Sequence, residues 1–137
     1  MTKIYWLAGT GAFVITACFA VLWHVVLFEQ QFLTLGVFTR MDEPIYPFGL
    51  AAWVLESIAI VLIYFRTDWR NNTMFEALKI AWLVGAYSAA SALFGMAAKV
   101  RIVDLTLWFG LTGGFIALHT SFLGIWLNRV SRKFAHQ

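Results

Sequence analysis

Residues 44–65, PIYPFGLAAWVLESIAIVLIYF, decide the fold, because this long apolar run is interrupted by a single charged side chain, Glu56. A helix needs about 20 apolar residues to cross a bilayer, so the stretch predicts a transmembrane helix over residues 45–65. Pro44 and Pro47 suit its first turn, where a backbone amide has no partner within the helix. A carboxylate at mid-membrane is costly, and we expect Glu56 to face protein or water rather than lipid.

Three further stretches contain no Asp, Glu, Lys or Arg, namely residues 4–28, 80–98 and 105–128. With 61% hydrophobic and 12% charged residues among 137, they predict an integral membrane protein with a single domain, residues 1–137. We predict an all-α fold in which four transmembrane helices form an up-down-up-down bundle. The expected helices are residues 4–28, 45–65, 74–98 and 104–127.

Polar residues mark where two of these helices begin. Thr73, followed by Glu76 three residues later, has the form of a capping box. Asp104 is a suitable N-cap for the fourth helix. Between the first and second helices, residues 29–43 are expected to form an interfacial connection that is partly helical.

Lys and Arg are distributed unevenly between the two ends of the predicted bundle. Three lie on the side of the loop that contains Asp42 and Glu43, namely Arg40, Lys99 and Arg101. The other seven lie on the side of the termini: Lys3, Arg66, Arg70, Lys79, Arg129, Arg132 and Lys133. Cytoplasmic loops carry the excess of positive charge, so both termini are predicted to be cytoplasmic. The net charge of +3 then reflects topology and predicts no nucleic-acid partner.

Small residues recur at helical spacing on each predicted helix, which lets helix backbones approach closely in a membrane. In the first helix the stripe comprises Gly9, Ala12, Thr16, Ala20 and His24. The packing positions predicted on the other helices are Gly49, Ala52, Gly85, Ser88, Ala92, Gly113 and Ala117. The expected partners are therefore membrane lipids and other integral membrane subunits or further copies of this chain.

Glu56 is the main candidate for chemistry, and the sequence leaves two interpretations open. A carboxyl group inside the membrane can bind and release a proton, which is the basis of proton-coupled transport. Alternatively, it can stay protonated and donate a hydrogen bond that locks the helices together. The sequence does not distinguish these two roles.

His24 and His119 suggest a haem, since two histidines on facing helices can ligate one iron. Counted from the outer ends of their helices, however, the two differ in depth by roughly 16 Å at 1.5 Å per residue. Only His24 is expected to share the outer half of the membrane with Glu56. We therefore predict no cofactor, with a haem or chlorophyll-type pigment on a single histidine as the alternative.

Other catalytic constellations are not evident in the sequence. No HExxH or repeated carboxylate-histidine spacing predicts a metal site. Cys18 is the only cysteine, which excludes an internal disulfide and a cysteine-rich zinc site. No serine or threonine has a recognisable His-Asp partner set, so we expect no enzyme.

Two stretches carry a family resemblance: LWHVVLFEQQF, residues 22–32, and GFIALHTSFLGIWL, residues 114–127. They resemble the end of the first helix and the last helix of families of small, uncharacterised four-helix bacterial membrane proteins. Trp23 and Phe28 match the family pattern, whereas His24 and Glu29 depart from it. The resemblance implies a four-helix fold in the bacterial inner (cytoplasmic) membrane and implies no particular activity.

The sequence suggests two functions. The first is an accessory, assembly or structural subunit of a larger membrane complex, suggested by the small-residue stripes on all four helices. The alternative is an oligomeric transporter or permease for a proton, cation or small amphiphile that works through Glu56. The sequence identifies neither a partner complex nor a transported substrate.

Overall fold

The computed structural model describes residues 2–38, 43–67 and 73–135, which are helical apart from short connections. The helices are α1 (Thr2–Val21), η1 (Leu22–Leu27), α2 (Glu29–Thr34), α3 (Tyr46–Arg66), α4 (Met74–Ala89), η2 (Ala90–Gly95), α5 (Met96–Lys99) and α6 (Leu105–Ala135). The two η segments are π-helical turns. Arg40, Asp42 and Arg70, which entered the prediction of sidedness, lie outside the described residues.

Four continuous helical stretches are long and apolar enough to cross a membrane. They are Lys3–Leu27, Tyr46–Arg66, Met74–Lys99 and Leu105–Phe134. The predicted class, an all-helical chain with four helices of membrane length, is thus confirmed for the described residues. The last helix continues beyond residue 127, where the apolar run ends, because Asn128 and Ser131 are buried and packing keeps this polar stretch helical.

The helix starts follow the predicted local chemistry. The backbone N–H of Glu76 donates to Thr73 Oγ1 at 3.2 Å, which caps α4. The N–H of Leu107 donates to Asp104 Oδ1 at 2.9 Å and caps α6 in the same way. Pro47 occupies the first turn of α3, as its missing N–H favours.

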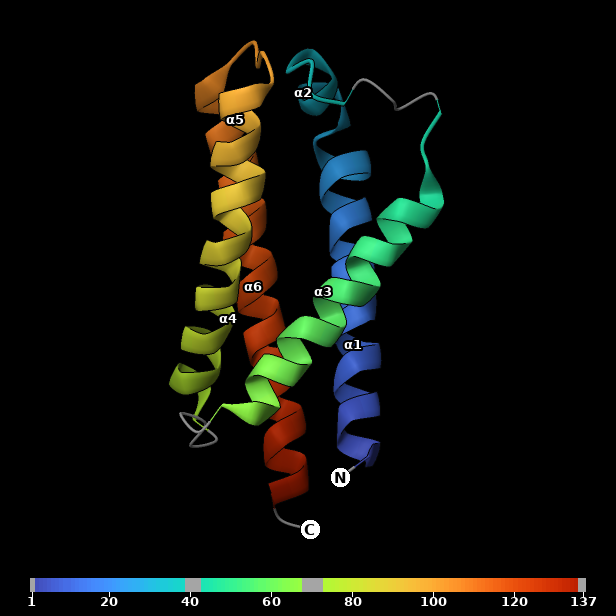
Figure 1. The fold of residues 1–137 in the computed structure, drawn as a ribbon, viewed down its shortest axis with the longest axis vertical. Coiled ribbons are helices and arrows are strands. Elements are labelled where there is room, and N and C mark those ends of the chain that lie inside the picture. The colour runs from blue at the N-terminus through green and yellow to red at the C-terminus, as the bar shows by residue number, and fades with distance from the viewer. Residues whose placement is uncertain (1, 39–42, 68–72, 136–137) are drawn as a thin grey trace.

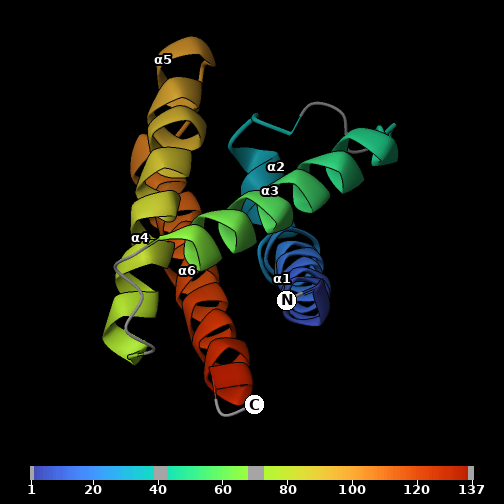
Figure 2. The ribbon, with the colours of Figure 1, turned by 60° about the horizontal axis from the view of Figure 1, so that its bottom comes forward.

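The four long helices are arranged unequally (Figure 1). α4 and α6 lie side by side along most of their length, and α1 packs against both α6 and α3. α3 crosses α1 obliquely and slants away from α4 towards the end of the molecule that carries α2 (Figures 1 and 2). The start of α1 and the end of α6 lie together at the opposite end, which we call the terminal end.

The terminal end is the more tightly packed part of the molecule. Gly124 of α6 faces α4 so closely that a Cβ there would lie 3.2 Å from the Ala77 carbonyl oxygen. The indole N–H of Trp126 donates to the Ala8 carbonyl at 3.1 Å, and its ring covers Gly11, where a Cβ would overlap it. These contacts use small residues to bring α1 and α4 against α6.

A second apolar cluster lies at the other end, around α2, η2 and the start of α6. Its buried members include Phe32, Leu35, Leu93 and Trp108. The indole N–H of Trp108 donates to the Leu93 carbonyl within η2 at 3.1 Å. The sequence predicts ordinary α-helix through both η segments. The wider π-helical turn, with its i→i+5 hydrogen bonds, could not be predicted because it has no recognisable sequence pattern.

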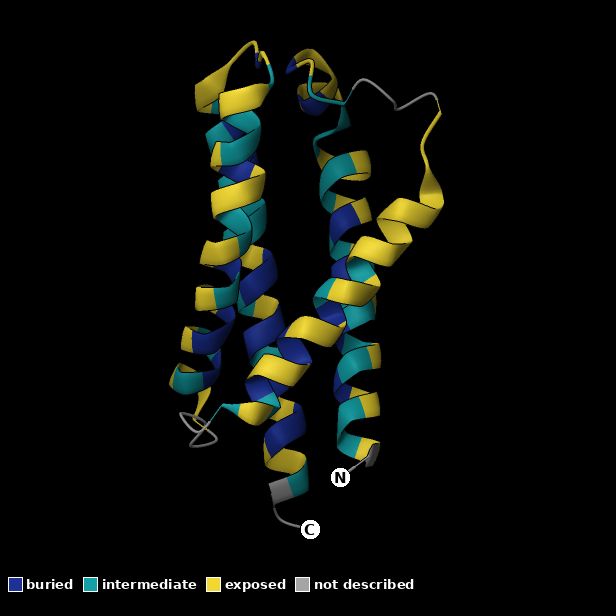
Figure 3. Ribbon diagram, viewed as in Figure 1, coloured by how far each residue is buried: buried dark blue, intermediate teal, exposed yellow. Residues whose placement is uncertain are grey.

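The first two turns of α3 pack against little of the molecule. Every residue from 45 to 52 is exposed, and the ribbon of this part of α3 is yellow in Figure 3. Gly49 has no atom within 4 Å of the position that a Cβ would take. The slant of α3 away from α4 therefore opens the bundle at this end.

Candidate functional site

A cavity of about 680 Å³ lies between α3 on one side and α4 and α6 on the other, with η1, α2 and the residues after α2 at its outer end. Its volume falls within the roughly 300–1,000 Å³ of ordinary small-molecule sites. The three ionisable residues singled out in the sequence all line it: His24, Glu56 and His119. Elements far apart in the sequence thus bring the predicted candidates to one place.

Glu56 extends from the middle of α3 and faces His119 of α6. Glu56 Oε1 lies 3.7 Å from His119 Nδ1, which is within ion-pair range but too long for a direct hydrogen bond. The Glu56 side chain is 35% exposed, whereas that of His119 is only 3% exposed. The carboxylate therefore reaches into the cavity, and the imidazole behind it is enclosed by protein.

Thr16 of α1 fixes the other side of the His119 ring. A hydrogen bond of 2.9 Å joins Thr16 Oγ1 to His119 Nε2, and both residues are buried. When Nδ1 carries the proton and faces Glu56, Nε2 accepts from the Thr16 hydroxyl. Three helices thus contribute one residue each to a polar chain that crosses the interior of the bundle.

This chain has the order hydroxyl, imidazole, carboxylate that is used in nucleophilic catalysis. The sequence does not reveal that Thr16, His119 and Glu56 belong together, because they are about 40 or more residues apart. Thr16 is only 1% exposed and does not line the cavity, so a substrate carbonyl cannot reach its oxygen. The hydroxyl accordingly orients His119, and the accessible end of the chain is Glu56.

The predicted depth of Glu56 relative to the histidines is wrong. The sequence predicted that only His24 shares the outer half of the membrane with Glu56, whereas the ion-pair partner of Glu56 is His119. The count took the outer ends of the helices to lie at one level, whereas α6 begins level with Leu35, beyond the end of η1. His119 lies near the middle of α6, and Glu56 lies near the middle of α3.

The offset of roughly 16 Å between the two histidines is also too large. The Phe115 ring contacts both imidazoles, with centroid distances of 4.7 Å to His24 and 5.2 Å to His119. The Val103 N–H, just before α6, donates to the Leu35 carbonyl at 3.3 Å. The outer end of α6 is therefore level with Leu35 rather than with the end of η1, and His24 lies deeper than the count assumed.

His24 sits in an aromatic corner of the cavity. Its Nδ1–H donates to the Ala20 carbonyl at 3.0 Å, which leaves Nε2 as the unprotonated nitrogen of the neutral ring. The rings of Phe32 and Phe115 each lie 4.7 Å from it, centroid to centroid. Nε2 of His24 would be the nitrogen left to bind a metal or pigment, whereas both nitrogens of His119 already face protein groups.

Conventional metal sites find no support in the described parts of the chain. Within residues 2–38, 43–67 and 73–135, no three His, Cys, Asp or Glu side chains gather as metal ligands. Cys18 is exposed on α1 and is not among the residues that line the cavity.

The cavity walls are mostly apolar and open on one side. Exposed residues at its edge include Leu55 and Ile63 on α3 and Tyr87 on α4, the last being 82% exposed. Thr112, which also lines the cavity, has a buried hydroxyl with no hydrogen-bond partner in the described structure. In a membrane, the open side between α3 and α4 faces lipid.

The predicted packing positions are distributed over different environments. Gly85 is buried against α6, where a Cβ would lie 2.5 Å from Thr120 Cγ2. Ser88, Gly113 and Ala117 are half-buried. Those on exposed surface are Gly49, Ala52 and Ala92.

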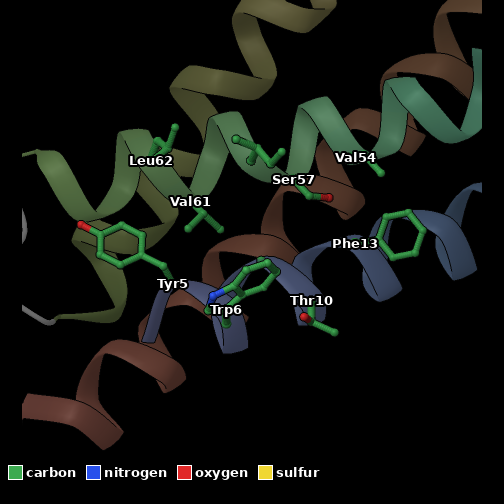
Figure 4. A pocket seen from close by; sticks show the side chains of 10 residues that line it. Tyr5, Trp6, Thr10, Phe13, Val54, Ser57, Val61 and Leu62 are labelled. Carbon is green, nitrogen blue, oxygen red and sulfur yellow. The ribbon is translucent and has the colours of Figure 1, made fainter. Parts of the chain in front are cut away.

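A second hollow, of about 660 Å³, lies between α1 and α3 on the side away from α4. Figure 4 shows Tyr5, Trp6 and Phe13 of α1 facing Val54 and Leu62 of α3 across it. Among the described residues, Tyr5 is the only ionisable one that lines it. This groove therefore offers apolar contact surface but none of the acid-base chemistry of the first cavity.

The fold and the site define an all-helical protein with four membrane-length helices and an ionisable cluster in a cavity among them. Comparison of the chain with protein-family models, with curated proteins and with solved structures gave no match.

Proposed function

We propose that this small integral membrane protein transports a proton together with, or in exchange for, a cation or small amphiphile, and that Glu56 is the coupling residue. The observation that carries the proposal is a partly exposed carboxylate in a cavity of ligand size, 3.7 Å from an enclosed imidazole. Intramembrane carboxylates and histidines that line cavities are the usual elements of proton pathways.

The surroundings of Glu56 favour this role over that of a structural acid. Within the described residues, no hydrogen bond links its carboxyl group to another side chain or to the backbone of a neighbouring helix. A carboxyl group that locked helices together would need such a partner, because an unsatisfied polar group inside the membrane is destabilising. A carboxyl group that exchanges protons needs access and a second proton acceptor, and Glu56 has both.

The membrane setting is part of the proposal. We propose that the four long helices cross the bacterial inner membrane in alternating directions, with both termini in the cytoplasm. Lys3, Arg129 and Lys133 are near the start of α1 or the end of α6, which lie together in Figure 1. That clustering agrees with the positive-inside rule.

Proton flux into proteoliposomes tests the proposal. Addition of a quaternary ammonium ion such as tetraethylammonium to the outside supplies the coupled solute, and an entrapped pH-sensitive dye reports the protons that cross with it or against it. The wild-type protein should change the lumenal pH faster than empty vesicles do when the cation is added, and Glu56→Gln should reduce the rate to that of empty vesicles. Glu76→Gln is the matched control, since Glu76 lies in the first turn of α4 and outside the cavity. Equal flux in wild type and Glu56→Gln would refute the proposal.

The accessory-subunit role is a second candidate, favoured by the bare surface of α3. Residues 45–52 are exposed, and Gly49 leaves room for another helix to approach closely. Gly49→Leu should weaken association with a second copy or with another membrane subunit while leaving the fold intact. Purification in mild detergent with chemical cross-linking measures this, with Gly110→Leu as a control on α6, where a Cβ also meets nothing. A lone monomer under every condition would contradict this second role.

A further inference from the structure

The charge balance of the cavity specifies what it binds. Its ionisable lining residues are Glu56 on α3, Tyr87 on α4, His119 on α6 and His24 on η1. Among the described residues that line it, none is Lys or Arg. Glu56 is therefore the one carboxylate among the described lining residues, and no Lys or Arg side chain in that lining neutralises it.

The Glu56 and His119 pair is electrically neutral when it holds one proton. This is true whichever of the two residues carries the proton, so the pair titrates as a unit. Removal of the proton leaves one negative charge facing the cavity. In an apolar environment that charge requires a partner, which a bound cation supplies at close range.

The side chains that line the cavity indicate that the ligand also has an apolar part. Apart from Glu56, the histidines and a few hydroxyl groups such as that of Thr112, the cavity is lined by aliphatic and aromatic residues such as Ile60 and Phe115. Aromatic faces attract cations as well as apolar groups. A strongly hydrated inorganic ion would find a single carboxylate here, since no three His, Cys, Asp or Glu side chains gather in the described chain.

We propose that the cavity binds a lipophilic monocation, such as an amine or onium ion with a bulky apolar body, in exchange for the proton of the Glu56 and His119 pair. This inference rests on the proposed function and names its substrate class. The proton bound by the pair leaves to bulk water as the cation takes its place, so total charge in the cavity is conserved. The cation enters from the lipid side between α3 and α4, where Leu55, Ile63 and Tyr87 are exposed.

Binding of tetraphenylphosphonium to the purified protein in detergent micelles tests the inference. Isothermal titration calorimetry gives the affinity, and a pH indicator in weakly buffered solution counts protons released. We expect about one proton released per cation bound by the wild-type protein. Glu56→Gln should weaken binding by about tenfold or more and abolish the release, while Glu76→Gln should behave as wild type.

Triphenylphosphine oxide, which has similar aromatic groups and no net charge, separates charge from shape in the wild-type protein alone. It should bind more weakly than tetraphenylphosphonium and release no proton. Equal affinities for the two probes, or tetraphenylphosphonium binding without proton release, would overturn the inference even if Glu56→Gln failed to fold. Proton flux that persists without tetraphenylphosphonium binding would reject the substrate class and leave the proposed function standing. Binding with proton release but without flux would reject transport and uphold the site.

Discussion

Replacement of Thr16 by valine isolates one hydrogen bond in the interior of the bundle. Valine has nearly the same shape as threonine, so Thr16→Val removes the hydroxyl and leaves His119 Nε2 without its partner. Thr16 is 1% exposed and His119 is 2% exposed, so water cannot replace the lost group. Hydrogen bonds between membrane helices contribute about 0.6 kcal/mol on average and about 1.7 kcal/mol at most.

A bond of 2.9 Å between two buried side chains belongs near the upper end of that range. We expect Thr16→Val to lower the free energy of unfolding by about 1 to 2 kcal/mol. Unfolding in mixed micelles with rising dodecyl sulfate, followed by far-ultraviolet circular dichroism, measures the loss. Thr16→Ser keeps the hydroxyl and should recover much of it, and Thr10→Val, at an exposed position on the same helix, serves as the control. A loss in Thr16→Val no larger than that in Thr10→Val would refute the role given to this bond.

Two further substitutions test packing, with the same unfolding assay. Gly85→Ala should cost about 1 to 3 kcal/mol, because its Cβ would lie 2.5 Å from Thr120 Cγ2 and would force α4 away from α6. Gly110→Ala, with open space at the same position, should change stability by less than about 0.5 kcal/mol, and similar losses in both would contradict the packing argument. Trp108→Phe should cost about 1 kcal/mol by removing the bond to the Leu93 carbonyl in η2. Faster amide hydrogen exchange in η2 should accompany that loss, and unchanged exchange would show that Trp108 does not hold the π turn.

Hydropathy and local chemistry predicted the helices well. The four membrane-length helices follow from four apolar runs, because each run alone satisfies the length that a bilayer requires. The caps at Thr73 and Asp104 follow from bonds between residues three apart, which a sequence displays directly. Such features depend on neighbours along the chain.

The meeting of Glu56 with His119 could not be predicted in this way. It depends on the relative depths of α3 and α6, which are set by packing between distant parts of the chain. Depth counted from the ends of apolar runs assumes that those ends lie at the same level. The Leu35 to Val103 bond shows that here the ends do not. The contribution of Thr16 was hidden for the same reason, since nothing local links α1 to the middle of α6.

The dense packing of the terminal end closes the Glu56 cavity on that side. Leu123 lines the cavity, and one turn further along α6 the interior is filled by Leu127 and Val130, which are 0% and 3% exposed. An ion or water molecule that enters the cavity from the α2 end therefore finds no open path past Glu56 to the terminal end. A continuous pore of this width would dissipate the voltage across the membrane, whereas a blind pocket holds its charge on one side at a time. Under the proposed function, a protein of 137 residues would thus hold a carboxylate within the bilayer without opening a continuous pore.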